Sequence, residues 1–361
     1  MTVLEDAHAN HGAMFVEHGG NRVIEDYGRP ERTHRAVRNV VGVIEFAFGI
    51  LEVTGDDRVK YVDNIVSNHV PREDGHGSYA LVLDPQGAIE ADLYVYNAGE
   101  RLLLFVPPDR TDPIVEEWRE KIFIDDVEIR VVTDDLAVFG IHGPKATEKV
   151  ASVLNGASAP EPPLSFVRGS MKDAGVTVIA GDGLAGEEGY EIICAADDAP
   201  DVFDTLVNHG MNAAPFGYTT WNTLTLEAGT PQFDSELRGN IPNVAGARNA
   251  LDFEKGCYVG QEVVSRVENR GRPSRRLAGL ALDTVPSAGA AVFDGDASVG
   301  EVTRAAMSPM REEPITLAYV DFGMDTADVT VRIDGEEHDA SVEELPFVTG
   351  SMRSERLPTY K

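Results

Sequence analysis

The chain has 361 residues, with 61 Asp or Glu and 31 Lys or Arg, and therefore a net charge of −30. This length exceeds what one hydrophobic core usually organises, so we expect two or three domains. A surface this acidic repels phosphate backbones, which excludes general nucleic-acid binding. The acidic residues are spread along the chain rather than gathered in a tail, which suggests a halophilic protein adapted to a high-salt cytoplasm.

The two cysteines, Cys194 and Cys257, make no disulfide framework, and neither has a partner at metal-ligand spacing. The segment 1–8 lacks an apolar signal region. The longest apolar stretch, 40–53, contains two glutamates and is too short to cross a bilayer. We therefore expect a cytoplasmic protein in a reducing compartment, with no metal site and no membrane association.

The first predicted elements are a short basic helix over 31–39 and a strand over 43–53. Arg32, Arg35 and Arg38 lie three residues apart and so share one face of that helix. This pattern fits an anion site or, more simply, a solvated helix face.

A β-hairpin is predicted over 79–96, because Pro85 and Gly87 supply turn dihedrals between two apolar runs. Asp92 lies on its second strand. Burial of this carboxylate would cost roughly a few kcal/mol unless it is paired or hydrogen-bonded. The alternative is an aspartate on an edge strand that faces water.

The glycine-rich loop 181–191 is not followed by the Lys-Ser/Thr of a phosphate loop, and the acidic residues within it also argue against phosphate binding. From the residues alone, Glu191 at its end is an exposed strand residue.

The segment Lys255-Gly256-Cys257-Tyr258-Val259-Gly260-Gln261-Glu262 is the most informative stretch. Its glycines allow a tight turn around Cys257, and an amphipathic helix is predicted over 261–269. A helix N-terminus and Lys255 beside the thiol both favour the thiolate, as in reactive or ligating cysteines. The alternative is a small buried hydrophobic residue in a loop.

The end of the chain contains a dense basic run and then a series of short strands. Five arginines, 266, 270, 272, 275 and 276, form either an exposed linker or a contact for an anion. From Leu277 onward, strand-like runs at regular spacing are broken by Gly, Pro and Asp, which predicts a small β-barrel.

These motifs resemble those of the glycine-cleavage T-protein (GcvT) superfamily. The segment 255–262, with Ser265-Arg266 and Arg270-Gly271, resembles the signature of its YgfZ-type folate-binding group. The resemblance implies an α+β fold, a three-domain cloverleaf with two mixed α+β (ferredoxin-like) domains and a C-terminal β-barrel around a central folate cavity. It places the first domain at 1–50 with 130–245, the second at 51–129 with 246–272, and the barrel at 275–361.

The resemblance also implies roles for individual residues. Asp92 matches the second Asp of the family's Gly-Gly-Ile-x-Asp-Asp-Leu segment, which contacts the folate amine and is catalytic. Tyr79 falls where the family has a tyrosine near the folate. Glu191 matches the Glu that holds the pterin, whose amino group and ring N–H one carboxylate can accept in a forked pair. The signature residues are Lys255, Gly256, Cys257, Tyr258, Gly260, Gln261, Glu262 and Arg266, with Cys257 as a second catalytic candidate.

The chain departs from the transferases of this superfamily at several positions. Trp221 and Thr225 stand where transferases have arginines that serve the folate site, and Ala47-Phe48-Gly49 replaces Ser-His-Met. Trp221 could still stack on an aromatic ligand. These departures favour the YgfZ side of the superfamily.

Three functional hypotheses follow. The first is a tetrahydrofolate-dependent factor for iron-sulfur cluster assembly or repair, with iron-sulfur client proteins as partners. The second is an aminomethyltransferase, a one-carbon transferase that uses a lipoylated carrier protein. The third is a non-catalytic folate-binding scaffold. All three imply tetrahydrofolate or a related reduced pterin as the ligand.

Overall fold

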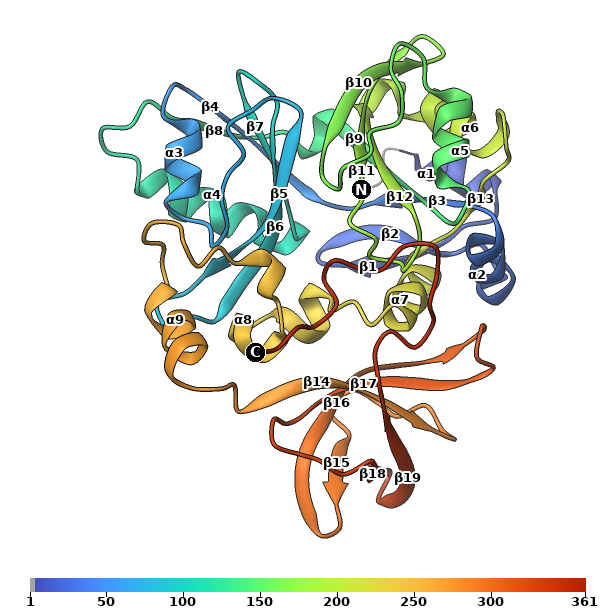
Figure 1. Ribbon diagram of the computed structural model, residues 1–361. Helices are drawn as coiled ribbons and strands as arrows, with labels where there is room; N and C mark the ends of the chain where they lie inside the picture. Colours follow the sequence, from blue (N-terminus) through green and yellow to red (C-terminus); the bar gives the residue numbers. More distant parts are fainter. Residues whose placement is uncertain (1–3) are drawn as a thin grey trace.

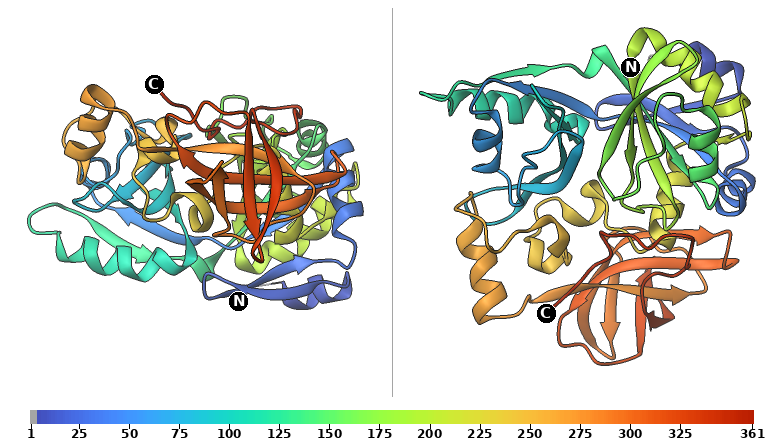
Figure 2. Two further views of the ribbon diagram at one scale, coloured as in Figure 1. Left: turned by 90° about the horizontal axis from the view of Figure 1, so that it is seen from below. Right: turned by 45° about the horizontal axis from the view of Figure 1, so that its top comes forward.

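The computed structural model describes residues 4–361, apart from the side chains of Asp6 and Arg270. Arg270 of the predicted basic run therefore lies outside the described side chains. Two α+β parts lie side by side, and a β-barrel lies against their lower edge (Figures 1 and 2). Each α+β part is built on one open sheet, so the predicted fold class is confirmed.

The apolar run 43–53 forms two strands in different sheets, rather than the single strand predicted. β3 (Gly42–Phe46) belongs to the first sheet and β4 (Gly49–Thr54) to the second. Gly49 allows the chain to cross between them, because a Cβ at this position would lie 1.8 Å from Thr111 Oγ1. The residues 47 and 48 therefore link the two α+β parts.

The first sheet has six strands, and helices pack against both of its faces. In spatial order β10, β11, β12, β9, β3 and β13, its strands are Phe166–Met171, Ala174–Ala180, Gly189–Ala195, Leu136–His142, Gly42–Phe46 and Ala214–Pro215. Alternate residues point to opposite faces. Val43 packs with α5 and α6, whereas Ile44 packs with α7 on the other side. The helices of this part are α1 (Glu5–Asn10), α2 (Pro30–Asn39), α5 (Ala146–Val153), α6 (Ala199–Asn208) and α7 (Tyr218–Glu227), with the hairpin β1 (Met14–His18) and β2 (Asn21–Asp26) beside them.

The second sheet has five strands and contains the predicted hairpin. In the order β5, β6, β7, β4 and β8, its strands are His76–Leu83, Ile89–Asn97, Leu102–Val106, Gly49–Thr54 and Glu128–Val131. On β6, Leu93 and Val95 pack with α3 (Arg58–Asp63) and α4 (Thr111–Glu120). Tyr94 and Tyr96 point to the opposite face, where they pack with residues of the first sheet.

A winding segment joins the α+β parts to the barrel. It contains η4 (Phe233–Leu237), α8 (Pro242–Ala245), η5 (Arg248–Ala250) and α9 (Gln261–Arg270). The remaining short turns are η1 (Pro108–Arg110), η2 (Thr133–Asp135) and η3 (Ala196–Asp198). Among the residues from 4 to 361, no helix is both long and apolar enough to cross a membrane.

The predicted C-terminal barrel is present and closed. Its strands, in spatial order β14, β17, β16, β15, β18 and β19, are Arg275–Leu282, Glu313–Asp321, Ala297–Ser308, Ala291–Asp294, Asp328–Ile333 and Glu336–Glu343. Closure leaves no open sheet edge at this end of the chain. The core of the barrel is formed by residues such as Leu280, Val292 and Val331.

The chain does not stay in the barrel after β19. The tail 344–361 runs back over the junction of the two α+β parts and ends near α8 (Figure 1). Backbone hydrogen bonds join Val348 to Glu227, Glu355 to Asp182 and Thr359 to Gly246. Through these bonds the tail binds the first α+β part and the winding segment. The three-domain division remains a proposal. The strands of each sheet and of the barrel lie inside the proposed residue ranges to within a few residues, but the tail leaves the barrel.

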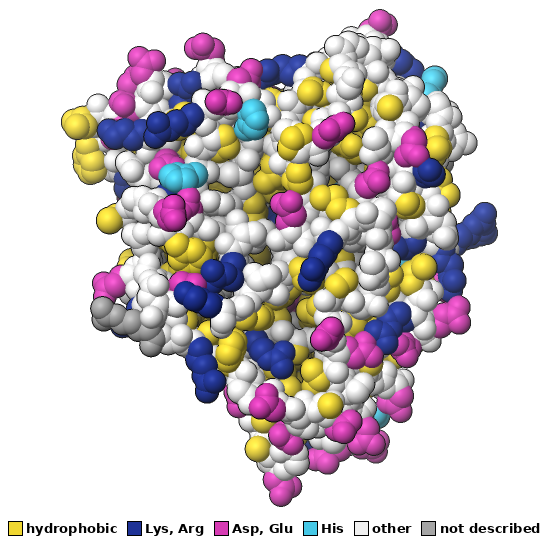
Figure 3. Space-filling model, viewed as in Figure 1, with side chains coloured by type: hydrophobic (Ala, Val, Ile, Leu, Met, Phe, Trp, Pro, Cys, Tyr) yellow, Lys and Arg dark blue, Asp and Glu magenta, His cyan; other side chains and the backbone are white. Residues whose placement is uncertain are grey.

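Acidic and basic side chains are both scattered over the face in Figure 3, and several Lys and Arg side chains lie at its lower left. The spread agrees with the even charge distribution of the sequence. Adaptation to high salt remains a prediction.

Candidate functional site

A cavity of about 390 Å³ lies where the two α+β parts meet the barrel. Its wall includes Asp92 of β6, Glu191 of β12, Trp221 of α7, Arg304 of β16 and Arg356 of the tail. Every part of the chain therefore contributes a side chain to it. Such junctions between domains are where small-molecule sites commonly occur.

Asp92 is held by two donors at one of its oxygens. Oδ2 accepts a hydrogen bond from the hydroxyl of Tyr79 at 3.0 Å and pairs with Arg356 Nη1 at 3.0 Å. The Asp92 side chain is only 13 % exposed, and β6 lies between β5 and β7. Asp92 is therefore a paired, largely buried acid and not a solvated edge-strand residue. Burial raises the pKa of Asp92, and the positive charge of Arg356 opposes this shift.

Arg356 bridges two acidic residues from different parts of the fold. Its Nε lies 3.2 Å from Asp182 Oδ2, and Asp182 also accepts a hydrogen bond from the Tyr94 hydroxyl at 2.9 Å. The guanidinium carbon lies 3.7 Å from the ring centre of Tyr79 and 4.7 Å from that of Tyr94. Ion pairs and aromatic faces therefore surround this guanidinium on several sides.

Glu191 differs from Asp92 because no basic side chain of the described residues forms an ion pair with it. Its Oε2 atom is buried and makes no hydrogen bond within residues 4–361. Burial raises the pKa of Glu191 to about 8, the nearby Asp182 adds to the shift, and Arg356 opposes it. A carboxyl group with this pKa, placed in a cavity wall, is typical of a functional site.

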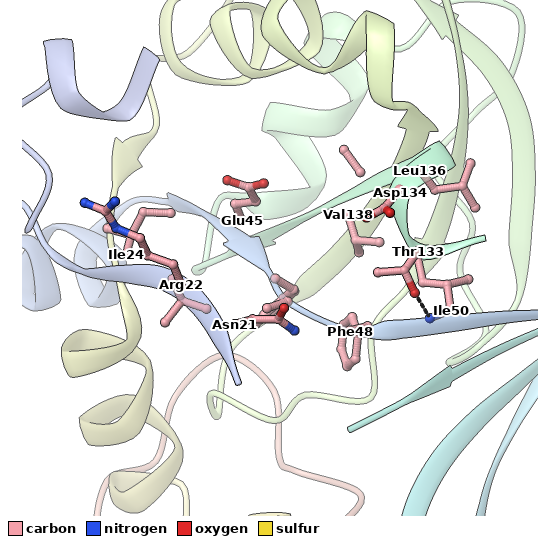
Figure 4. A pocket seen from close by; sticks show the side chains of 14 residues that line it. Asn21, Arg22, Ile24, Glu45, Phe48, Ile50, Thr133, Asp134, Leu136 and Val138 are labelled. Carbon is pink, nitrogen blue, oxygen red and sulfur yellow. Dashed lines mark hydrogen bonds between the residues drawn. The ribbon is translucent and has the colours of Figure 1, made fainter. Parts of the chain in front are cut away.

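Aromatic side chains form the apolar part of the wall. Trp221 is 5 % exposed and makes edge contacts with Phe46, with ring centres 4.9 Å apart. Phe48 also lines a neighbouring pocket of about 90 Å³, in which Ile50 donates its N–H to Thr133 Oγ1 at 2.9 Å (Figure 4). Glu45 of that pocket is bonded to His8 at 2.7 Å. The central cavity is the better candidate site, because Asp92, Glu191 and Arg356 all lie in its wall.

Comparison with known proteins identifies the family. The model described as "GCVT N-terminal domain" matches residues 4–255, and the "Glycine cleavage T-protein C-terminal barrel domain" matches residues 275–349. The chain belongs to the glycine cleavage T-protein family.

Several proteins similar to this chain are named aminomethyltransferases. A probable aminomethyltransferase of Halobacterium salinarum is 32 % identical over 96 % of this chain and 98 % of its own length. An aminomethyltransferase of Bacillus subtilis is 28 % identical over 93 % of this chain and 94 % of its own. The crystal structure of glycine cleavage system aminomethyltransferase T from Bartonella henselae shares the fold, with a TM-score of 0.86 and 21 % identity over 97 % of this chain and 98 % of that one. These findings support the T-protein superfamily but not the finer likeness to the YgfZ group.

Within this T-protein family fold, the cysteine motif is not part of the central cavity. Cys257 is exposed on the loop before α9, as predicted, but it is not among the described residues that line the cavity. Lys255 does not direct its charge to the thiol. Its Nζ donates to the backbone carbonyls of Asp63, Val66 and Asn68 at 2.6, 2.8 and 2.8 Å. All three ammonium protons are thus used in holding the chain that follows α3.

The other signature residues also have structural contacts or face solvent. Of the two glycines, only Gly260 has a left-handed conformation, with φ of +80°, and a Cβ there would lie 2.7 Å from the carbonyl oxygen of Asp84. Tyr258 is buried in an apolar cluster that includes residues of β5 and β6. Gln261 begins α9, where Glu262 and Arg266 are exposed. The motif therefore fastens the loop against the β5–β6 turn.

Four residues of the site had no specific prediction: Tyr94, Asp182, Arg304 and Arg356. Tyr94 could have been found, because it lies two residues from Asp92 and so shares its face of the strand. Asp182 lies in the glycine-rich loop before Glu191. From the sequence, its charge indicated only that this loop does not bind phosphate. Arg356 has no local signal, because its partners lie far away in the sequence.

We expect the Glu191→Gln variant to change how stability depends on pH. Because the folded-state pKa of Glu191 is raised to about 8, the wild type should lose stability as pH rises from about 5 through 8. The variant should lack this loss, so its stability relative to the wild type should be greater at pH 8 than at pH 5 by roughly 3–4 kcal/mol. Denaturant unfolding at both pH values measures the difference. An equal difference at pH 5 and pH 8 would contradict the pKa assignment.

The signature motif can be tested with two neighbouring variants. Lys255→Met should lower the free energy of unfolding by about 2–4 kcal/mol, because it leaves three carbonyls without their donor. Cys257→Ser should change it by less than about 0.5 kcal/mol, since the thiol is exposed. Urea titrations of both variants measure this contrast. Similar effects of the two substitutions would refute the structural role of Lys255.

Proposed function

We propose that this protein is a tetrahydrofolate-dependent aminomethyltransferase. The observation that best supports the proposal is that Asp92 and Glu191, two acids from different parts of the fold, line one cavity. The relatives named aminomethyltransferase match over almost the whole chain, which supports the same activity.

The chemistry of the cavity fits a reduced pterin. Glu191 offers a buried oxygen without a hydrogen-bond partner among the described residues, and a pterin presents an amino group and a ring N–H side by side. The aromatic wall formed by Phe46, Phe48 and Trp221 suits a flat ring system. Tyr79 lies behind Asp92 and acts on the ligand through it, because its hydroxyl is bonded to Asp92.

In the proposed reaction, two nitrogens of tetrahydrofolate form bonds to the methylene carbon of an aminomethyl group carried on the lipoyl sulfur of a carrier protein. The carbon–sulfur bond and the bond from this carbon to its amino group break. The two N–H protons of the folate pass to the sulfur and to the amino group, so that the carrier recovers its thiol and ammonia is released. Tetrahydrofolate supplies the amine that accepts the carbon. Asp92 orients this amine and stabilises positive charge that develops there. Arg356 and Tyr79 both bind Oδ2 of Asp92, which leaves Oδ1 to face the amine. The ion pair with Arg356 favours the ionised carboxylate that this role needs.

The iron-sulfur hypothesis is less well supported. It depends on the signature segment 255–262, which lies outside the cavity wall, and on the replacements Phe48, Trp221 and Thr225. The comparisons favour the aminomethyltransferase hypothesis, which was the alternative from sequence. A folate-binding scaffold would bind tetrahydrofolate without turnover.

A glycine-cleavage assay with lipoylated carrier protein and tetrahydrofolate tests the proposal. The wild type should turn over, and Asp92→Asn should lower kcat by about 10²- to 10⁴-fold, because the amide carries no charge to stabilise the amine. Cys257→Ser serves as the matched control and should retain wild-type kcat. The proposal fails if the wild type binds tetrahydrofolate without turnover, or if Asp92→Asn is as active as the wild type.

Arg356→Met should move the acid limb of the activity–pH profile to higher pH. Without the guanidinium, burial raises the pKa of Asp92 further, so a higher pH is needed to ionise it. Arg356→Lys should restore part of the shift, and Tyr79→Phe should cause a smaller shift in the same direction. The measurement is kcat as a function of pH for the wild type and the three variants. An acid limb that does not move in Arg356→Met would show that the pair does not control Asp92.

A further inference from the structure

The second sheet ends at β8, a short strand with a free outer edge. β8 pairs with β4 on one side, and no strand among residues 4–361 pairs with it on the other. An edge of this kind presents unpaired N–H and C=O groups and is a template for another strand. The loop between α4 and β8 projects from the same side of the molecule (Figures 1 and 2). None of the residues of β8 lines the central cavity, so a contact at this edge is independent of the proposed function.

The hydrogen-bonding pattern shows which residues of β8 face this edge. Val132, directly after β8, donates its backbone N–H to the carbonyl of Ile50 at 2.9 Å. Hydrogen-bonded pairs alternate along an antiparallel ladder, so Ile129 and Val131 direct their backbone groups away from β4. The carbonyl of Ile129 accepts a hydrogen bond from Arg119 of α4 at 2.5 Å, which fits this direction and leaves its second lone pair available. The backbone groups of Ile129 and Val131 can therefore pair with a further antiparallel strand.

The charged side chains of β8 indicate which strand fits. Glu52 of β4 pairs with Arg101 at 2.6 Å and with Arg130 of β8 at 3.4 Å, so positive and negative charges alternate across the sheet. Glu128 is exposed and forms no ion pair within residues 4–361. A second copy of β8, antiparallel and centred on Ile129, would place its Arg130 opposite this Glu128, and the reverse. Centring the pair on residue 128 or 130 would instead set like charges against each other.

Large apolar side chains are exposed at both ends of such a strand pair. Phe123 and Ile124, in the loop before β8, are 84 % and 95 % exposed, and Val131 at the other end of β8 is 43 % exposed. In the pairing centred on Ile129, Val131 of one copy lies opposite residue 127 of the other, where that loop ends. Two-fold symmetry forms this apolar contact twice. Burial of these side chains therefore favours association.

We propose that two copies of this chain associate through β8 and form one continuous sheet about a two-fold axis. The interface is isologous, since each copy offers the same edge, the same two charges and the same apolar loop. Main-chain hydrogen bonds join the strands, as in other cases of strand addition. The pairs between Glu128 and Arg130 fix the register.

Sedimentation equilibrium of the full chain tests this interface. Salt of about 1 M shortens the Debye length to about 3 Å, so the net charge of −30 on each copy is screened while charges in contact still interact. The wild type should approach twice the mass of the 39.0 kDa chain. Arg130→Glu sets two pairs of like charges at the interface and should raise the dissociation constant about tenfold or more. A wild type that stays at 39.0 kDa at all concentrations overturns the proposal.

An exchange of the two charges distinguishes the interface from a local effect. The double variant Glu128→Arg/Arg130→Glu again sets opposite charges against each other, so its dissociation constant should return to within about threefold of the wild type. Both variants place the same new charge beside Glu52, so damage within one copy would affect them equally. The proposal is overturned if Arg130→Glu leaves the dimer unchanged, or if the exchange does not restore it.

The apolar loop provides a second variant that does not alter β8. Phe123→Ser/Ile124→Ser removes two exposed side chains and should also weaken the dimer, by about tenfold. Met307→Ser, at a 53 % exposed position of the barrel, is the matched control and should sediment as the wild type does. A dimer that is insensitive to the loop variant, or equally sensitive to both, would show that the copies meet elsewhere and overturns the proposal.

Discussion

The buried guanidinium of Arg356 is the constraint on which the rest of the site depends. It lies between Asp92 and Asp182 and against the rings of Tyr79 and Tyr94. An unpaired charge buried at this depth would cost several kcal/mol, so each partner requires the others. Asp92 comes from the second sheet, Asp182 from the loop before β12, and Arg356 from the tail beyond the barrel. The site is therefore complete only when the tail has returned from the barrel to the α+β parts.

A second buried ion network reinforces the same junction. Arg38 of α2 pairs with Glu187 at 3.0 Å and with Glu227 at 2.8 Å, and all three side chains are almost fully buried. Glu187 also accepts hydrogen bonds from the backbone and side chain of Ser351 in the tail. Charge-assisted hydrogen bonds thus join α2, the loop that leads to Glu191, α7 and the tail. These contacts fix the backbone on which Glu191 and Arg356 are placed.

Sequence reasoning succeeded where the signal is local. The turn residues around Pro85 and Gly87 predicted the hairpin that carries Asp92, and the regular spacing of short strands predicted the barrel. The carboxylates Asp92 and Glu191 came from motif resemblance, and the structure brings both to one cavity. Their roles remain predictions. The sequence indicated only that Asp92 must be paired or hydrogen-bonded if it is buried. It could not identify the partner, because Arg356 is 264 residues away.

The failures have a common physical cause, which is that a charge acts where its atoms lie and not where its residue stands in the sequence. Lys255 is two residues from Cys257, yet its ammonium bonds carbonyls of residues 63–68. Arg38 has the spacing of a solvated basic face, yet it is buried between two glutamates. The single strand predicted over 43–53 failed similarly, because both of its halves are apolar and only tertiary packing separates them into two sheets.

The same principle applies to α7, which contains no arginine. The resemblance led us to expect an arginine at position 225, where this chain has a threonine. In space, Arg304 of β16 donates to Thr225 Oγ1 at 2.9 Å and to the carbonyl of Asn222 at 3.3 Å. A single bulged residue, Thr303, precedes Arg304 in that strand. The wall of the cavity beside α7 therefore carries a guanidinium that the sequence of α7 does not reveal, because it comes from a strand about 80 residues later in the chain.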